Sequence, residues 1–225
     1  MSVPEDETTM ATEVKICGLS TPETMEAALA AGADYVGLVF HRASPRHVEI
    51  GAARRLAGQA RGRAWSVAVT VDAADAEIDL IAAEVGPDYI QAHGSETPER
   101  VAAISTRTGI PVIKAIAVAD ADDLERAGDY RKAAAMILFD TKAPPTLAGG
   151  LPGGNGLAFD WELCRKSAVS GRFALSGGLD AGNVGRAIAV TGAAVVDVSS
   201  GVERSRGVKD VELIRKFVEA VRRAG

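Results

Sequence analysis

Eight short apolar runs alternate with longer amphipathic stretches, and this alternation limits the fold more than any other feature of the chain. Most of the runs are rich in aliphatic and β-branched residues, as is typical of parallel strands buried on both faces. We therefore predict eight strands. They cover residues 14–17, 35–40, 65–71, 89–93, 111–116, 136–140, 173–176 and 195–199.

The stretches between the runs have the pattern of helices. Apolar residues recur at helical spacing in residues 211–221. At Thr21 and again at Thr97, a Thr-Pro-Glu sequence offers an N-cap, a proline in the first turn and an early acid. Gly32 and Gly109 stand where those two helices should end.

Alternating strands and helices form either a closed barrel or a doubly wound open sheet. Eight units in 225 residues, with no boundary to a second domain, favour a single (β/α)8 TIM barrel of the α/β class over residues 13–225. The alternative is an open dinucleotide-binding sheet. Its glycine fingerprint is missing, because Leu157, Ala158 and Phe159 follow Gly154-Asn155-Gly156.

Charge and the first residues limit the partners of the chain. A net charge of −5 and a pI near 5.3 argue against a general nucleic-acid binder. No apolar run is long enough to cross a membrane, which needs about 18 residues. Residues 1–12 are acidic and lack the apolar region of a signal peptide. We expect a disordered tail at 1–12 and a cytoplasmic, monomeric protein with a small-molecule partner.

Three chemically active side chains end predicted strands: Cys17, His93 and Asp140. In a (β/α)8 barrel these ends form the rim that carries the active site. A free cysteine by itself is more often a small buried residue, and an Asp often caps a turn. Asp140, however, precedes residues 141–158, a long stretch without helix or strand pattern, which is typical of a functional loop.

Three glycine clusters indicate a phosphate site. Two of them follow the last two predicted strands, where barrels commonly bind phosphate through backbone N–H groups. We therefore expect a phosphorylated substrate. The residues are Gly154, Asn155 and Gly156 before these strands, Gly177 and Gly178 after the seventh, and Ser199, Ser200 and Gly201 after the eighth.

Four polar residues lie inside predicted strands. Lys15 precedes Cys17 by two positions, and Asp197 is on the last strand, next to the first in a closed barrel. We predict that these two form a buried ion pair, because an unpaired buried charge is costly. We expect structural pairing for Gln91 and Lys114 as well. On the rim, Arg46 is either a solvated surface charge or the partner of a substrate carboxylate.

These motifs, in this order, resemble those of the phosphoribosylanthranilate isomerases, barrel enzymes of tryptophan biosynthesis. The resemblance covers about residues 14 to 218. The matching segments are VKICG at 14–18, ADYVGLVF at 33–40, SPR at 44–46, QAHG at 91–94, VIKA at 112–115, FDT at 139–141, GGNG at 153–156, FDW at 159–161, SGGL at 176–179, NV at 183–184, VDVSSGVE at 196–203 and KD at 209–210.

The resemblance implies an Amadori rearrangement by general acid–base catalysis, without metal or cofactor. Asp140 would be the acid that opens the sugar ring, and Cys17 the base that takes the proton from C2′. Arg46 would bind the anthranilate carboxylate, His93 would line the pocket, and the glycine clusters would hold the phosphate. Such roles require the pKa values of the acid and the base to be tuned by the pocket.

The chain departs from the usual family pattern at four places, which do not include Cys17 or Asp140: Ala92, Asn155, Leu157 and Ser176. Two rival functions remain. One is another phosphosugar isomerase of the histidine-pathway type, which has an Asp at the end of its first strand, where this chain has Cys17. The other is a barrel that binds a phosphate ligand without catalysis.

Overall fold

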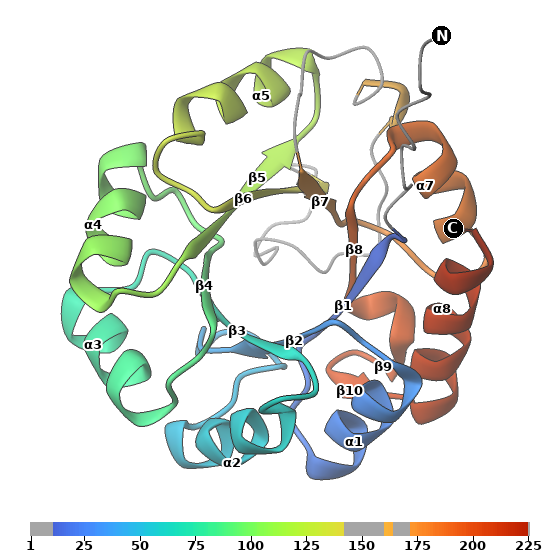
Figure 1. The fold of residues 1–225 in the computed structure, drawn as a ribbon, viewed down its shortest axis with the longest axis horizontal. Helices are drawn as coiled ribbons and strands as arrows, with labels where there is room; N and C mark the ends of the chain where they lie inside the picture. Colours follow the sequence, from blue (N-terminus) through green and yellow to red (C-terminus); the bar gives the residue numbers. More distant parts are fainter. Residues whose placement is uncertain (1–10, 142–159, 164–171, 225) are drawn as a thin grey trace, which may run out of the picture.

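The computed structural model describes residues 11–141, 160–163 and 172–224. Its eight main strands form a closed parallel barrel, which confirms the predicted fold and rules out the open sheet (Figure 1). Each strand pairs with the next along the chain, and the last pairs with the first. The strands are β1 (Glu13–Cys17), β2 (Tyr35–Val39), β3 (Trp65–Thr70), β4 (Tyr89–Ala92), β5 (Val112–Val118), β6 (Met136–Thr141), β7 (Phe173–Leu175) and β8 (Val195–Val198).

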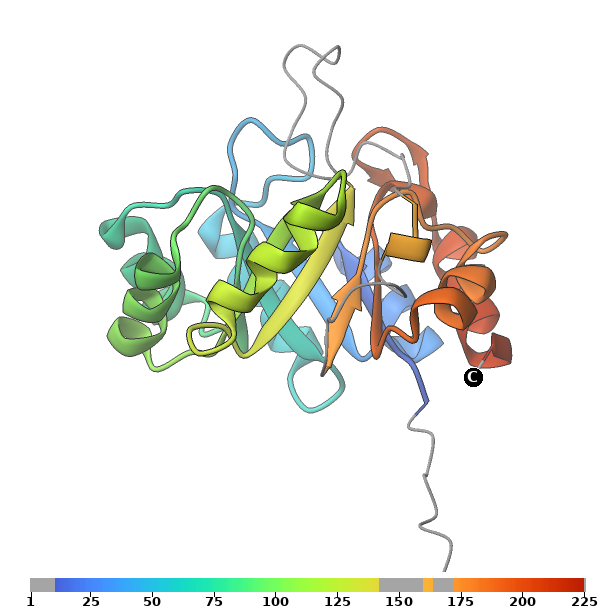
Figure 2. The ribbon, with the colours of Figure 1, turned by 90° about the horizontal axis from the view of Figure 1, so that it is seen from above.

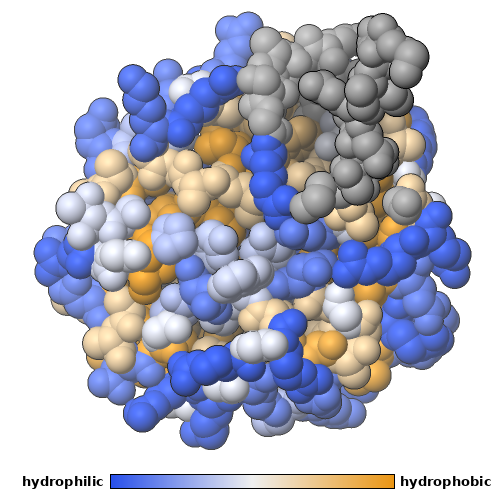
Figure 3. Space-filling model, in the orientation of Figure 1, coloured by the Kyte–Doolittle hydropathy of each residue, from blue (hydrophilic) through white to orange (hydrophobic). Residues whose placement is uncertain are grey.

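Helices surround this ring of strands (Figures 1 and 2). They are α1 (Pro22–Ala31), α2 (Ile50–Ala60), α3 (Asp75–Glu84), α4 (Pro98–Thr108), α5 (Ala121–Glu125), α7 (Val184–Thr191) and α8 (Val211–Ala224), with the short 3₁₀ helices η1 (Arg126–Tyr130) and η2 (Ser200–Val202). In the space-filling view, hydrophilic side chains cover much of the outer rim that the helices form (Figure 3).

The predicted helix starts and ends are confirmed for α1 and α4. The Thr21 hydroxyl accepts the N–H of Thr24, and the Thr97 hydroxyl accepts the N–H of Arg100, both at 3.2 Å. Each such cap stabilises a helix by about 1 kcal/mol. The two helices end at Gly32 and Gly109.

The core has two layers, because successive side chains of a strand point to opposite sides. One layer packs between the strands and the helices. The other fills the barrel interior, to which most strands contribute every second residue. The inner cluster is Cys17, Tyr35, Val39, Val67, Val69, Ile113, Ala115, Met136, Leu138, Ala174 and Val195.

An antiparallel hairpin after β8 was not predicted. Its strands are β9 (Glu203–Ser205) and β10 (Val208–Lys209), and it lies at the end of the barrel toward which β6 points (Figure 2). It therefore adds two short strands to the catalytic rim expected from the fold.

The ends of the chain fall partly outside the described residues. Residues 1–10, most of the expected tail, are among those not described. Thr12 is buried, and its carbonyl accepts a hydrogen bond of 2.9 Å from Arg222 of α8. Among the helices of the described ranges, none has the length and apolarity needed to span a bilayer.

Candidate active site

Cys17, His93 and Asp140 point into the same barrel interior. Cys17 belongs to the inner cluster itself. Asp140 is two positions after Leu138 of that cluster, so both side chains lie on the same side of β6. His93 is four positions after Tyr89, which packs against the cluster, so it too faces the interior. In the ring, β8 and β7 stand between β1 and β6 on one side. The loops after β7 and β8, which carry two of the three predicted glycine clusters, therefore lie between the thiol and the carboxyl.

The thiol of Cys17 lies beside a glycine of the neighbouring strand. A Cβ atom at Gly37 of β2 would be 2.9 Å from Cys17 Sγ, so a larger residue there would displace the thiol. Burial raises the pKa of Cys17, whereas the positive charges of Lys15 and Lys209 act to lower it. The thiol thus needs nearby cations to ionise.

Lys15 and Asp197 form the buried ion pair that the sequence predicted. Lys15 Nζ lies 3.0 Å from Asp197 Oδ1, and their strands pair at these two residues. Burial alone would lower the pKa of Lys15, but the charges of Asp197 and Cys17 outweigh it, and the net effect is an increase. The ammonium therefore stays charged beneath the thiol.

His93 contacts the predicted acid. His93 Nε2 lies 3.2 Å from Asp140 Oδ2, and Gln91 Nε2 lies 2.9 Å from His93 Nδ1. Asp140 is only 4 % exposed, and its other oxygen accepts the N–H of Thr141 at 2.8 Å. Asp140 is thus held from two sides at the end of β6.

Arg46 is buried and paired, not a solvated surface charge. Its Nε and Nη2 donate to the two carboxylate oxygens of Glu203 at 2.7 and 3.0 Å. Lys209 Nζ donates to the same carboxylate at 2.9 Å. Although burial alone would raise it, these cations lower the pKa of Glu203 to about 2. The stem of Arg46 crosses Gly18, directly after Cys17: a Cβ there would lie 2.7 Å from Arg46 Cδ.

The loops after β7 and β8 leave space only for glycine at two points. A Cβ at Gly177, whose φ is +92°, would lie 2.1 Å from the Thr141 hydroxyl. A Cβ at Gly201 would lie 2.0 Å from the carbonyl oxygen of Leu179. Ser199 donates its hydroxyl to the Cys17 carbonyl at 3.2 Å and accepts from Lys209. The third predicted cluster, residues 154–156, lies outside the described residues.

Lys114 has a structural role, as expected. Its Nζ donates to Glu96 at 2.8 Å and to the carbonyl oxygens of Ala92 and Gly94. It lies between two inner-cluster residues, Ile113 and Ala115, so it points away from the lumen.

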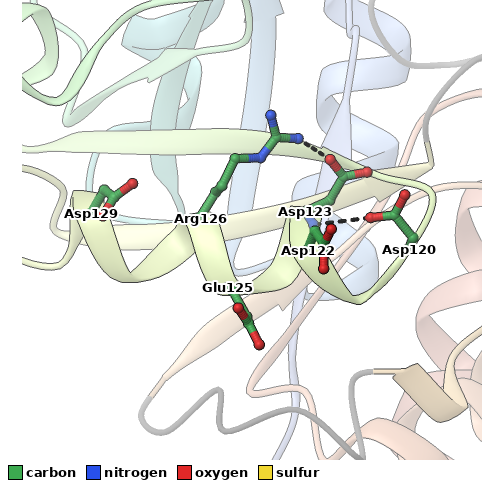
Figure 4. A pocket seen from close by; sticks show the side chains of 6 residues that line it. All are labelled: Asp120, Asp122, Asp123, Glu125, Arg126 and Asp129. Carbon is green, nitrogen blue, oxygen red and sulfur yellow. Dashed lines mark hydrogen bonds and ion pairs between the residues drawn. The ribbon is translucent and has the colours of Figure 1, made fainter.

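An acidic hollow beside α5 and η1 contains none of the predicted site residues (Figure 4). Its acids serve the local fold: Asp120 caps α5 by accepting the N–H of Asp123, and Asp123 pairs with Arg126. Over the residues that the structure describes, no set of three or more His, Cys, Asp and Glu side chains is arranged to bind a metal ion.

Glu203 and Lys209 were missed as site residues. Both belong to segments that resemble the family, but neither was predicted to have a role. Gly207, which lies between them in the sequence, could have indicated a hairpin turn. Such a turn brings Glu203 and Lys209 together on paired strands.

The comparisons agree with this geometry. A family model described as N-(5'-phosphoribosyl)anthranilate isomerase matches residues 14–220. A protein of that name from Rhodopseudomonas palustris (strain BisB5) is 55% identical over 213 residues, 95% of this chain and 97% of the relative.

Solved structures agree as well. The phosphoribosyl anthranilate isomerase of Thermotoga maritima has a TM-score of 0.83 at 36% identity, covering 93% of this chain and 98% of that one. A structure of such an enzyme with reduced 1-(o-carboxyphenylamino)-1-deoxyribulose 5-phosphate has a TM-score of 0.79 at 34% identity, with the same coverage. The chain therefore belongs to the N-(5'-phosphoribosyl)anthranilate isomerase family, the isomerases of tryptophan biosynthesis that its motifs resemble.

Proposed function

We propose that this chain converts N-(5'-phosphoribosyl)anthranilate into 1-(2-carboxyphenylamino)-1-deoxyribulose 5-phosphate, with Cys17 as general base and Asp140 as general acid. The observation that carries the proposal is the convergence of these two side chains on one lumen, with the loops after β7 and β8 between them. An acid and a base on a phosphate-binding rim are the parts that this rearrangement requires.

The steps balance with these two groups. Asp140 gives its proton to the furanose ring oxygen while the bond from that oxygen to C1′ breaks, which leaves an open-chain Schiff base. The Cys17 thiolate then removes the proton from C2′, and the electron pair forms an enolamine. The enolamine tautomerises to the ketone, as C1′ gains a proton and the 2′ hydroxyl loses one. None of these three steps changes the oxidation level of the molecule as a whole.

Arg46 is proposed to bind the carboxylate of the anthranilate. Within the described residues, its side chain donates to Glu203 through Nε and Nη2. A guanidinium has five N–H donors in one plane, so an edge remains for a second carboxylate. Glu203 fixes the direction of that edge beside Gly18.

The phosphate is proposed to bind at Gly177, Gly178 and residues 199–201, with residues 154–156 as a third part. Gly177 and Gly201 support this, because both are half-buried and carry no side chain, which lets a phosphate approach the backbone N–H groups closely. His93 is proposed to line the same pocket, because it contacts Asp140. Monomeric state and cytoplasmic location remain predictions.

The test is a fluorescence assay that follows phosphoribosylanthranilate consumption by the purified protein without added metal or nucleotide. Turnover is expected, and its absence would reject the assignment. Cys17→Ala and Asp140→Asn should each lose more than about 100-fold in kcat. Asp123→Asn is the matched control, because it changes a buried Asp outside the lumen and should retain wild-type kcat. A near-normal rate in either active-site variant would reassign that role.

A further inference from the structure

A hydrogen-bond chain crosses the lumen from Gln91 through His93 to Asp140. Gln91 Nε2 lies 2.9 Å from His93 Nδ1, and His93 Nε2 lies 3.2 Å from Asp140 Oδ2. Gln91 is fully buried, whereas the His93 side chain is 16 % exposed. The chain bridges β4 and β6, with small Ala115 of β5 in the inner cluster between them.

In the amide orientation that the structure gives, the nitrogen of Gln91 selects one tautomer of His93. A carboxamide nitrogen only donates hydrogen bonds, so His93 Nδ1 must accept and carries no hydrogen. The neutral imidazole then has its hydrogen on Nε2, which donates to Asp140 Oδ2. Since Asp140 Oδ1 accepts from Thr141, both carboxylate oxygens face donors. This arrangement stabilises the ionised Asp140, the form left after an acid has given up its proton.

The same amide has a second usable orientation. Gln91 Oε1 is buried and has no hydrogen-bond partner within the described part of the chain. Rotating the amide by half a turn therefore breaks no bond of Oε1 and brings it to His93 Nδ1. Nδ1 then carries the hydrogen, and the bare Nε2 accepts the O–H of a protonated Asp140. This second arrangement holds one proton more than the first, taken up from water.

We propose that Gln91 is a positioning residue that sets the tautomer of His93 and, through it, the protonation state of Asp140. The inference rests on the proposed role of Asp140 as general acid. Other charged or titratable groups face this chain from β8 and β1. Asp197 is close enough to interact with both His93 and Asp140, Lys15 neutralises Asp197, and Cys17 lies above Lys15.

The first test observes the tautomer directly. The ring nitrogens of the three histidines are recorded by ¹⁵N NMR at pH 8, and His93→Ala identifies the His93 signals. The wild-type protein should show His93 with its hydrogen on Nε2. Gln91→Met keeps the length of the side chain but removes its donor, and should give a mixture of tautomers. Gln59→Met on α2 is the matched control and should leave the His93 signals unchanged. A His93 tautomer that Gln91→Met leaves unchanged would overturn the proposal.

The second test separates positioning from packing. Gln91→Met should lower kcat by about 10-fold, leave KM within about twofold, and move the alkaline limb of the kcat–pH profile to higher pH, because the ionised Asp140 then loses the fixed donor at His93 Nε2. In a His93→Ala background the same substitution should have no further effect, because Gln91 then has nothing to orient. An equal loss in both backgrounds, with an unmoved pH profile, would mean a packing role and overturn the inference. A wild-type protein without turnover would reject the proposed function instead, while the NMR result would still decide the role of Gln91.

Discussion

Lys15 Nζ lies 3.0 Å from Asp197 Oδ1 inside the barrel, and neither side chain is more than 4 % exposed. Removing one partner of such a pair leaves the other charge buried and uncompensated, which costs about 3–5 kcal/mol. We predict that Lys15→Met lowers the free energy of unfolding by about this amount in urea titrations. The double variant Lys15→Met/Asp197→Leu should recover most of the loss. A single variant within about 1 kcal/mol of wild type would contradict a charged pair.

This ion pair was predictable from sequence because two simple rules suffice. Side chains two apart on a strand share a face, and a closed barrel pairs its last strand with its first. The same rules placed Cys17, His93 and Asp140 on one lumen. Repeated alternation and local caps such as Thr21 are short-range signals, so the fold itself was also predictable.

The contacts of Arg46 and Gln91 were not predictable in the same way. Glu203 reaches Arg46 only because the hairpin after β8 folds over the rim, and it is 157 positions away in the chain. The partner of Gln91 depends on side-chain rotamers and not on hydrophobic pattern. Residues 154–156, which belong to the predicted phosphate site, lie outside the described residues.

Cys17 should impose a strong pH dependence on catalysis. Burial disfavours the thiolate and raises the pKa of Cys17 above its ordinary value of about 8.5. As the base must be ionised, kcat/KM should rise with pH through and beyond neutrality, by about tenfold per pH unit on the acidic limb. The rate of alkylation of Cys17 by iodoacetamide should follow the same curve. A kcat/KM that is already level between pH 6 and 7 would contradict a protonated resting thiol.

Glu203 should stabilise the fold at neutral pH and lose this contribution in acid. Its pKa is lowered to about 2 by Arg46 and Lys209 against the effect of burial, compared with about 4.3 in the unfolded chain. Stability from this group is therefore present above about pH 4.3 and lost as the pH falls toward 2. The difference corresponds to about 3 kcal/mol at pH 7.

Glu203→Gln should thus unfold more easily at pH 7, with a difference from wild type that narrows at pH 3. It should also raise KM, because Arg46 loses the group that directs it. Glu212→Gln is the control: Glu212 forms an exposed ion pair with Arg215, whose contribution should be below about 1 kcal/mol. Unfolding titrations of the variant and of wild type at pH 7 and pH 3 test this. The same difference in the free energy of unfolding at both pH values would contradict the lowered pKa of Glu203.

Alanine substitutions at Gly177 and Gly192 distinguish an effect on phosphate binding from an effect on backbone conformation. At this position φ is +92°, and a Cβ would meet the Thr141 hydroxyl at 2.1 Å, next to Asp140. Gly192 at the end of α7 also has a positive φ, of +65°, but a Cβ there would meet nothing within 4 Å. Gly192→Ala should therefore cost about 1 kcal/mol of stability and leave the kinetics unchanged. Gly177→Ala has at least the same backbone cost and must also push the β7 loop away from β6. It should raise KM for the phosphorylated substrate by about tenfold or more, a loss of about 1.4 kcal/mol in binding. Steady-state kinetics on both variants test this, and equal KM values would remove the β7 loop from the proposed phosphate site.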